Sequence, residues 1–116
     1  MVIEQRTVGG VAVIDLSGKW ALGDGDGLLK DKVSSLVHQG LKEVAINLGG
    51  LSYMDSAGLG ELISAHSTMT RAGGHIRIFN LTKRVSDLLT ITKVVTVFDV
   101  FDSEGEALKS FGAATQ

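Results

Sequence analysis

The chain has 116 residues, a length at which one domain can bury a working core, so we expect a single domain over residues 1–116. Its formal charge of −2 gives no reason to expect nucleic acid or an anionic membrane surface as a partner, and the lack of cysteine excludes disulfides and thiolate metal sites. No run approaches the roughly 18 apolar residues of a membrane span, and the start, Met1 to Arg6, does not resemble a signal peptide. We therefore expect a cytoplasmic protein with no direct membrane insertion.

The N-terminal part of the chain predicts a β-hairpin. Residues 2–8 and 11–17 show the alternation of side chains that is typical of strands. Gly9-Gly10 lies between them, and a Gly-Gly pair in this position is typical of a two-residue hairpin turn. A glycine-rich loop is expected from Gly18 to Gly27.

The rest of the chain alternates between apolar strands and amphipathic helices. The runs expected as strands are 44–48, 75–81 and 94–98. The segments with helical spacing begin at Leu28, near Ser56, after Thr82 and after Ser103, with Thr82 and Ser103 as N-caps, and end near Gly40, Gly73, Leu89 and Phe111. With the hairpin, this order predicts an α/β fold: a mixed sheet of four to five strands, mostly parallel after the hairpin, with about four helices.

The junction between the strand 44–48 and the next helix places Ser56 where negative charge is tolerated. A helix N-terminus leaves four N–H groups without intrahelical partners and carries about half a positive charge. A phosphate on Ser56 would be stabilised there, which points to a switch rather than a catalyst. Another interpretation stays open: Ser and Asp are preferred N-caps, and Ser56 can serve as a cap alone.

Two glycines in the first turn of this helix need an explanation. Gly58 and Gly60 each cost about 0.5–1 kcal/mol relative to alanine inside a helix. We expect a close approach to the backbone here, either by a partner or by the neighbouring strand.

No catalytic, cofactor or metal site is predicted. The junction is not a G-x-S-x-G hydrolase elbow, because Met54 stands two positions before Ser56. The three histidines, His38, His66 and His75, lie on different elements, and His66 is expected as a partly buried side chain of an apolar helix face. The chain is therefore not expected to be an enzyme.

The segment Gly23–Gly27 has two open interpretations. It lacks the third ligand and the final glutamate of a calcium loop, and it lacks the Lys-Ser/Thr of a phosphate-binding loop. It is either a turn into the first helix, with Asp24 or Asp26 as N-cap, or an acidic surface loop that binds a partner. Trp20, expected in the same loop region, is either a hydrophobic plug or a contact residue.

The residues around Ser56 resemble the signature of the STAS domain of bacterial anti-sigma factor antagonists. The resemblance lies in an apolar strand followed by an aspartate, a Ser or Thr, a small residue and Gly-Leu-Gly opening a helix, here Asn47-Leu48 and Leu51–Gly60. It covers the opening hairpin, which ends at Leu16–Gly18, and extends to the segment 97–101, with a departure in the Gly18–Gly27 loop.

The resemblance implies a STAS-like single domain that acts in transcription regulation, for example in a stress response. It implies an anti-sigma factor that is also a serine-protein kinase as partner, phosphorylation of Ser56 that abolishes binding, and a serine phosphatase that restores it. The residues that it implies in partner binding are Asp55, Ser56, Ala57, Gly58, Leu59 and Gly60, with Asp24 matched to an aspartate of the family's loop. An alternative is an adaptor of the same fold without a switch, in a signalling scaffold or beside a membrane transporter, in which Ser56 only caps its helix.

Overall fold

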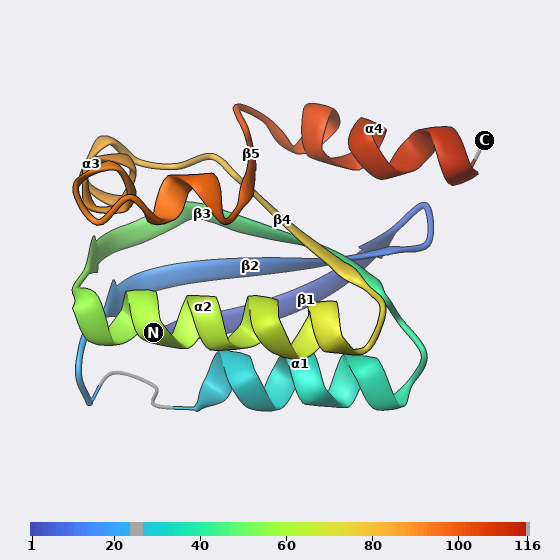
Figure 1. Cartoon of the computed structure of the whole chain (residues 1–116), viewed down its shortest axis with the longest axis horizontal. Coiled ribbons are helices and arrows are strands. Elements are labelled where there is room, and N and C mark those ends of the chain that lie inside the picture. The colour runs from blue at the N-terminus through green and yellow to red at the C-terminus, as the bar shows by residue number, and fades with distance from the viewer. Residues whose placement is uncertain (24–26, 116) are drawn as a thin grey trace.

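The protein is a five-stranded mixed sheet with helices on both faces (Figure 1). The computed structural model describes residues 1–23 and 27–115. The strands in these residues are β1 (Val2–Val8), β2 (Val11–Trp20), β3 (Glu43–Met54), β4 (His75–Phe79) and β5 (Asp99–Phe101). The helices are α1 (Leu28–His38), α2 (Ser56–Arg71), α3 (Lys83–Ile91), the short 3-10 helix η1 (Val94–Thr96) and α4 (Glu104–Thr115).

The strands lie in the order β1-β2-β3-β4-β5, with β1 antiparallel to β2 and the other neighbours parallel. The predicted sheet is therefore confirmed. Gly9 and Gly10 make the hairpin turn with φ angles of 56° and 84°, the left-handed region that glycine enters without steric cost.

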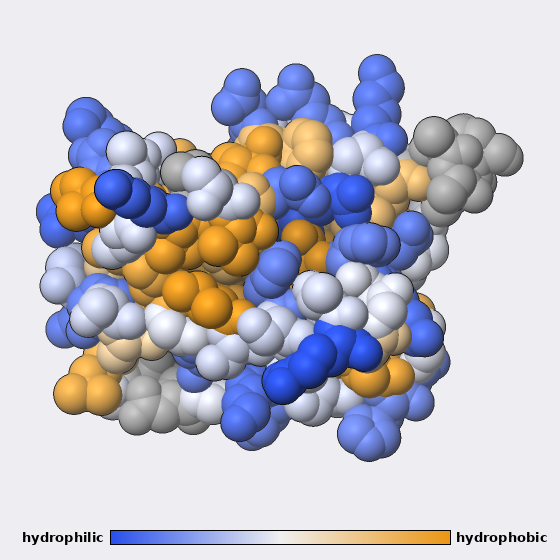
Figure 2. Space-filling view, viewed as in Figure 1, coloured by the Kyte–Doolittle hydropathy of each residue, from blue (hydrophilic) through white to orange (hydrophobic). Residues whose placement is uncertain are grey.

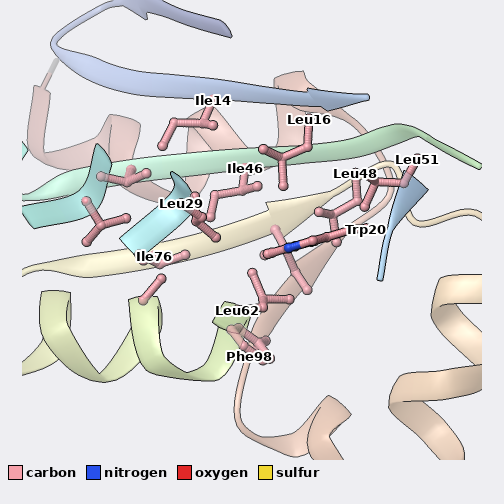
Figure 3. Close-up of a cluster of buried hydrophobic side chains, with 14 of the residues drawn as sticks. Ile14, Leu16, Trp20, Leu29, Ile46, Leu48, Leu51, Leu62, Ile76 and Phe98 are labelled. Atoms are coloured by element: carbon pink, nitrogen blue, oxygen red, sulfur yellow. The ribbon is translucent and has the colours of Figure 1, made fainter. Parts of the chain in front are cut away.

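Alternation along the strands divides the core into two clusters. Successive strand side chains point to opposite faces, so Ile14 and Leu16 pack with α1, α2 and α3, whereas Val11 and Val13 pack with α4. The larger cluster fills the space between the sheet and the first three helices (Figure 3). The smaller cluster includes Phe111 of α4.

The apolar run 94–98 was expected as a strand, and this prediction is wrong. Residues 94–96 form η1, and the last strand begins one residue after the run, where Asp99 pairs with Arg77 of β4. The run is apolar because Phe98 is buried in the larger cluster, where its ring meets His66 edge to face at 5.0 Å between centroids. This contact also confirms His66 as a partly buried residue of the α2 face.

Trp20 was expected in a loop but ends strand β2. Beyond two register irregularities, β2 stays parallel to β3 as far as the pair Trp20 and Met54. Gly50 permits this close pairing, because a Cβ there would lie 2.8 Å from the Leu16 carbonyl oxygen. The Trp20 side chain is only 2% exposed, so of its two interpretations the hydrophobic plug is confirmed (Figure 3).

No helix in the described part of the chain is both long and apolar enough to cross a membrane.

Candidate functional site

Ser56 is the first residue of α2, at the carboxyl end of β3. One residue, Asp55, separates it from the last strand residue, Met54. Loops at the carboxyl ends of parallel strands are where α/β folds commonly place binding sites. In Figure 1 this end of α2 lies at the same end of the molecule as α3.

Asp55, not Ser56, is the N-cap of α2. Its backbone is extended, and its Oδ1 accepts hydrogen bonds from the N–H groups of Ala57 at 2.9 Å and Gly58 at 3.1 Å. The interpretation of Ser56 as the cap is therefore wrong, because the cap position lies one residue earlier. The Ser56 side chain is exposed, and its hydroxyl makes no hydrogen bond to any residue that the structure describes.

Asp55 also joins α2 to the end of β2. Its Oδ2 accepts a hydrogen bond from Leu22 N at 3.2 Å, and its own N–H donates to the Trp20 carbonyl oxygen at 3.2 Å. The hydrogen bond from Gly58 N–H lowers the pKa of the Asp55 carboxyl most, followed by that from Leu22. The group that precedes Ser56 is therefore a carboxylate near neutral pH.

The two glycines of the first turn differ in their surroundings. A Cβ on Gly58 would lie 2.5 Å from the Trp20 carbonyl oxygen and 3.1 Å from Met54 Cγ. The predicted close approach is thus made by the strand end at Gly58. A Cβ on Gly60 would meet no atom within 4 Å, so at this exposed position the backbone is open to a partner.

The residues expected to bind a partner do not all lie at the surface. Ser56, Ala57 and Gly60 are exposed and Asp55 is half-buried, whereas Gly58 and Leu59 are buried. Asp24 lies outside the described residues, as does Asp26. The N-cap of α1 is Gly27, not either aspartate.

The structure adds residues that the sequence pattern did not indicate. Glu61, one turn into α2, accepts a hydrogen bond from Gly27 N–H at the start of α1. Leu22, next to Asp55, is 78% exposed. At the same edge of the sheet the Arg84 guanidinium lies over the Tyr53 ring, 5.5 Å from its centroid. These contacts join segments that are far apart in the sequence, so a local pattern does not reveal them. The only local signal is Gly27, which has no side chain with which to cap α1.

Apolar surface adjoins the site. In Figure 2, a hydrophobic area covers the region between α2 and η1. The large apolar side chains that are exposed in the described chain include Leu22, Ile91 and Val97. Apolar surface beside a polar site is typical of protein–protein interfaces.

The described residues contain no group of three His, Cys, Asp or Glu side chains that could hold a metal ion. What the arrangement offers chemically is an exposed hydroxyl at the positive end of a 16-residue helix, with a capping carboxylate on one side and an open glycine backbone on the other.

A family model for the STAS domain matches residues 3–107. The chain belongs to the STAS domain family. Among curated relatives, the anti-sigma-B factor antagonist of Bacillus subtilis is 33% identical over 73 residues, which span 63% of this STAS chain and 66% of the relative, just under two thirds of its length. The anti-sigma F factor antagonist of Paenibacillus polymyxa is 24% identical over 91% of both chains.

Solved structures agree with this assignment at the level of the fold. The anti-sigma factor antagonist SpoIIAA of Bacillus superimposes in its unphosphorylated form with a TM-score of 0.70 and 21% identity, covering 94% of this STAS chain and 96% of that chain. Its phosphorylated form superimposes with a TM-score of 0.72 and 20% identity, covering 94% and 98%. Both curated relatives are named as anti-sigma factor antagonists.

Proposed function

We propose that this STAS protein is an anti-sigma factor antagonist that switches partners through phosphorylation of Ser56. In its unphosphorylated form it binds an anti-sigma factor that is also a serine kinase. The kinase transfers a phosphate to Ser56 and the complex dissociates; a serine phosphatase restores binding. Such a switch would act on transcription in the cytoplasm.

The observation that carries this proposal is the division of roles between Asp55 and Ser56. Asp55 satisfies the N–H groups of Ala57 and Gly58, so the Ser56 hydroxyl is not needed for the helix and is exposed to a kinase. In the adaptor without a switch Ser56 would only cap its helix, and the N-cap is Asp55. The names of the curated relatives support the same choice.

The energetics of the switch follow from charge. Phosphorylation adds about −1.5 to −2 charges at pH 7. The added charge would lie next to the Asp55 carboxylate, and in a packed interface it would be removed from water without a built-in cation. A loss of about 2.8 kcal/mol already lowers affinity about a hundredfold, which is enough to release the partner.

The test uses three baits in lysate of the native host: wild type, Ser56→Asp and Ser56→Ala. We expect wild type and Ser56→Ala to retain an ATP-binding serine kinase, identified by mass spectrometry, and Ser56→Asp to lose it. The retained kinase is then purified and supplied with ATP. It should phosphorylate the wild-type protein and leave Ser56→Ala unmodified.

Equal affinity of Ser56→Asp and wild type for the kinase would contradict the switch, and retention of the same non-kinase protein by all three baits would favour an adaptor.

A further inference from the structure

The N-cap residue of helix α1 has no side chain. It is Gly27, with φ +80°, and no side-chain hydrogen bond from the cap residue satisfies the first turn. The first N–H groups of a helix have no intrahelical partners, and they favour a nearby negative charge.

Glu61 of α2 supplies that charge from another helix. Its Oε1 accepts the hydrogen bond from Gly27 N–H across 34 positions of the sequence. The side chain is half-buried, and its Oε2 is buried without a hydrogen bond from the described residues. A carboxylate oxygen that is buried without a hydrogen bond costs free energy, so helix propensity or packing alone does not explain this position.

The end of β2 is held by a second carboxylate, Asp55. Leu22 N–H donates to Asp55 Oδ2 at 3.2 Å, and Asp55 N–H donates to the Trp20 carbonyl oxygen at 3.2 Å. Two carboxylates of the β3–α2 region, one just before Ser56 and one five positions after it, therefore fix the end of β2 and the start of α1. Leu22 is held next to Asp55 with its side chain 78% exposed.

We propose that Glu61 is a positioning residue of the docking surface: it holds the start of α1 against α2, while Asp55 holds Leu22, so that the start of α1 lies beside Leu22 and Ser56 on the surface that meets the partner. This inference rests on the proposed function, and the partner is the anti-sigma serine kinase proposed above. Glu61 acts on docking only, because it holds other residues in place and does not touch the hydroxyl that is modified.

The first measurement uses the isolated protein and no partner. Amide hydrogen exchange is compared among wild type, Glu61→Ala, Glu61→Gln and Glu4→Ala, in which an exposed glutamate of β1 is removed as a charge-matched control. We expect Glu61→Ala to speed exchange about five- to tenfold at the Gly27 amide, which loses its acceptor, and at the Asp31 amide, which makes the first backbone hydrogen bond of α1 to the Gly27 carbonyl oxygen at 2.8 Å. Glu61→Gln keeps an acceptor oxygen and should recover part of the protection, and Glu4→Ala should match wild type.

The second measurement uses the purified kinase retained by the wild-type bait. We expect Glu61→Ala to raise the KM for Ser56 phosphorylation about tenfold with kcat unchanged, because docking and not chemistry is impaired. Glu61→Gln should restore part of the KM. Circular dichroism establishes that each variant is folded.

The outcomes separate this inference from the proposed function. Unchanged exchange at the Gly27 and Asp31 amides in Glu61→Ala would show that the hydrogen bond does not hold α1, and this would overturn the inference. Faster exchange with an unchanged KM would make Glu61 a structural cap only, which also overturns it. If wild type binds no kinase while Glu61→Ala still speeds exchange, the proposed function fails, and the role in docking fails with it.

Discussion

At the residue scale, Asp55 joins three parts of the molecule through one carboxylate. One of its oxygens caps α2 and the other holds Leu22, while its backbone N–H reaches the end of β2. Because these hydrogen bonds favour the charged form, they lower the pKa of Asp55 and keep a negative charge beside Ser56. A phosphate on the neighbouring hydroxyl therefore meets a charge that is already fixed in place.

Asp15 of β2 is a second carboxylate with a lowered pKa. Asp15 accepts from Arg6 Nε at 2.8 Å and from Asn47 Nδ2 at 2.9 Å, and Arg6 also donates to Glu104 at the start of α4. The hydrogen bond from Arg6 is the largest cause of the lowered pKa of Asp15. The pair is partly exposed, so water and salt weaken its contribution to stability.

The pH dependence of stability follows from the direction of this shift. A carboxyl whose pKa is lower in the folded state stabilises the protein above its unfolded pKa of about 3.9 and loses that contribution as the pH falls through the folded value. We expect Asp15→Asn to be less stable than wild type near pH 7 and to lose less stability between about pH 5 and pH 2. Urea unfolding at a series of pH values measures this.

The control for this prediction is Asp102→Asn, an exposed aspartate whose side chain has no hydrogen bond or ion pair within the described residues. It should follow the wild-type profile. Parallel profiles for wild type and Asp15→Asn would show that the contact with Arg6 is not formed in solution.

At the scale of the element, the first turn of α2 contains a matched pair of glycines. Gly58→Ala places a Cβ 2.5 Å from the Trp20 carbonyl oxygen, so the strand end and helix must separate, and we expect a loss of about 1–3 kcal/mol of unfolding free energy. Gly60→Ala meets open space and should gain about 0.5–1 kcal/mol, because alanine is the better helix former. Urea unfolding of the two variants measures both values.

Binding separates the two glycines further. If a partner approaches the backbone at Gly60, then Gly60→Ala should be more stable than wild type yet weaker in binding the kinase. A Gly60→Ala protein with unchanged affinity would place the interface elsewhere on α2, and a stable Gly58→Ala protein would contradict the packing at Trp20.

Elements with local signals were predictable from the sequence. The Gly9-Gly10 turn and the caps Thr82 and Ser103 depend on residues within a few positions, and each forms as expected, with Thr82 Oγ1 accepting from Val85 N and Ser103 Oγ from Glu106 N. The run 94–98 misled because apolar residues predict burial and do not state whether a sheet partner is present.

The candidate site was predictable at Ser56 but not in its supporting contacts. The strand-to-helix junction places Ser56 and Asp55 at the start of α2, although the choice between them as cap depends on where the helix begins, by a single residue. Glu61 and Gly27 are brought together only by the packing of α1 on α2. No local pattern carries that contact, because it is a product of the tertiary fold.

At the scale of the whole molecule, the sheet separates two cores of unequal size. The larger holds side chains from α1, α2 and α3, and the smaller depends on Ala107 and Phe111 of α4 with Val11, Val13, Ala45 and Phe79 of the sheet. In Figure 1, α4 lies apart from α1 and α2, across the sheet. Beyond this cluster, α4 is joined to the sheet through Arg6 and Glu104, and through Arg77, whose guanidinium lies 4.1 Å from the Phe111 ring centroid.

This asymmetry predicts two modes of opening. Phe111→Ala and Leu36→Ala each remove a buried side chain and should each lower the unfolding free energy by about 2–5 kcal/mol. Because α4 packs on the smaller cluster, we expect Phe111→Ala to speed amide exchange in α4 more than in β3 and α2, whereas Leu36→Ala should speed exchange in all three alike. Uniform acceleration by Phe111→Ala would mean that both cores open as one unit. Selective opening of α4 would leave the larger core intact, and since α2 with Ser56 packs on that core, Phe111→Ala should retain its affinity for the kinase.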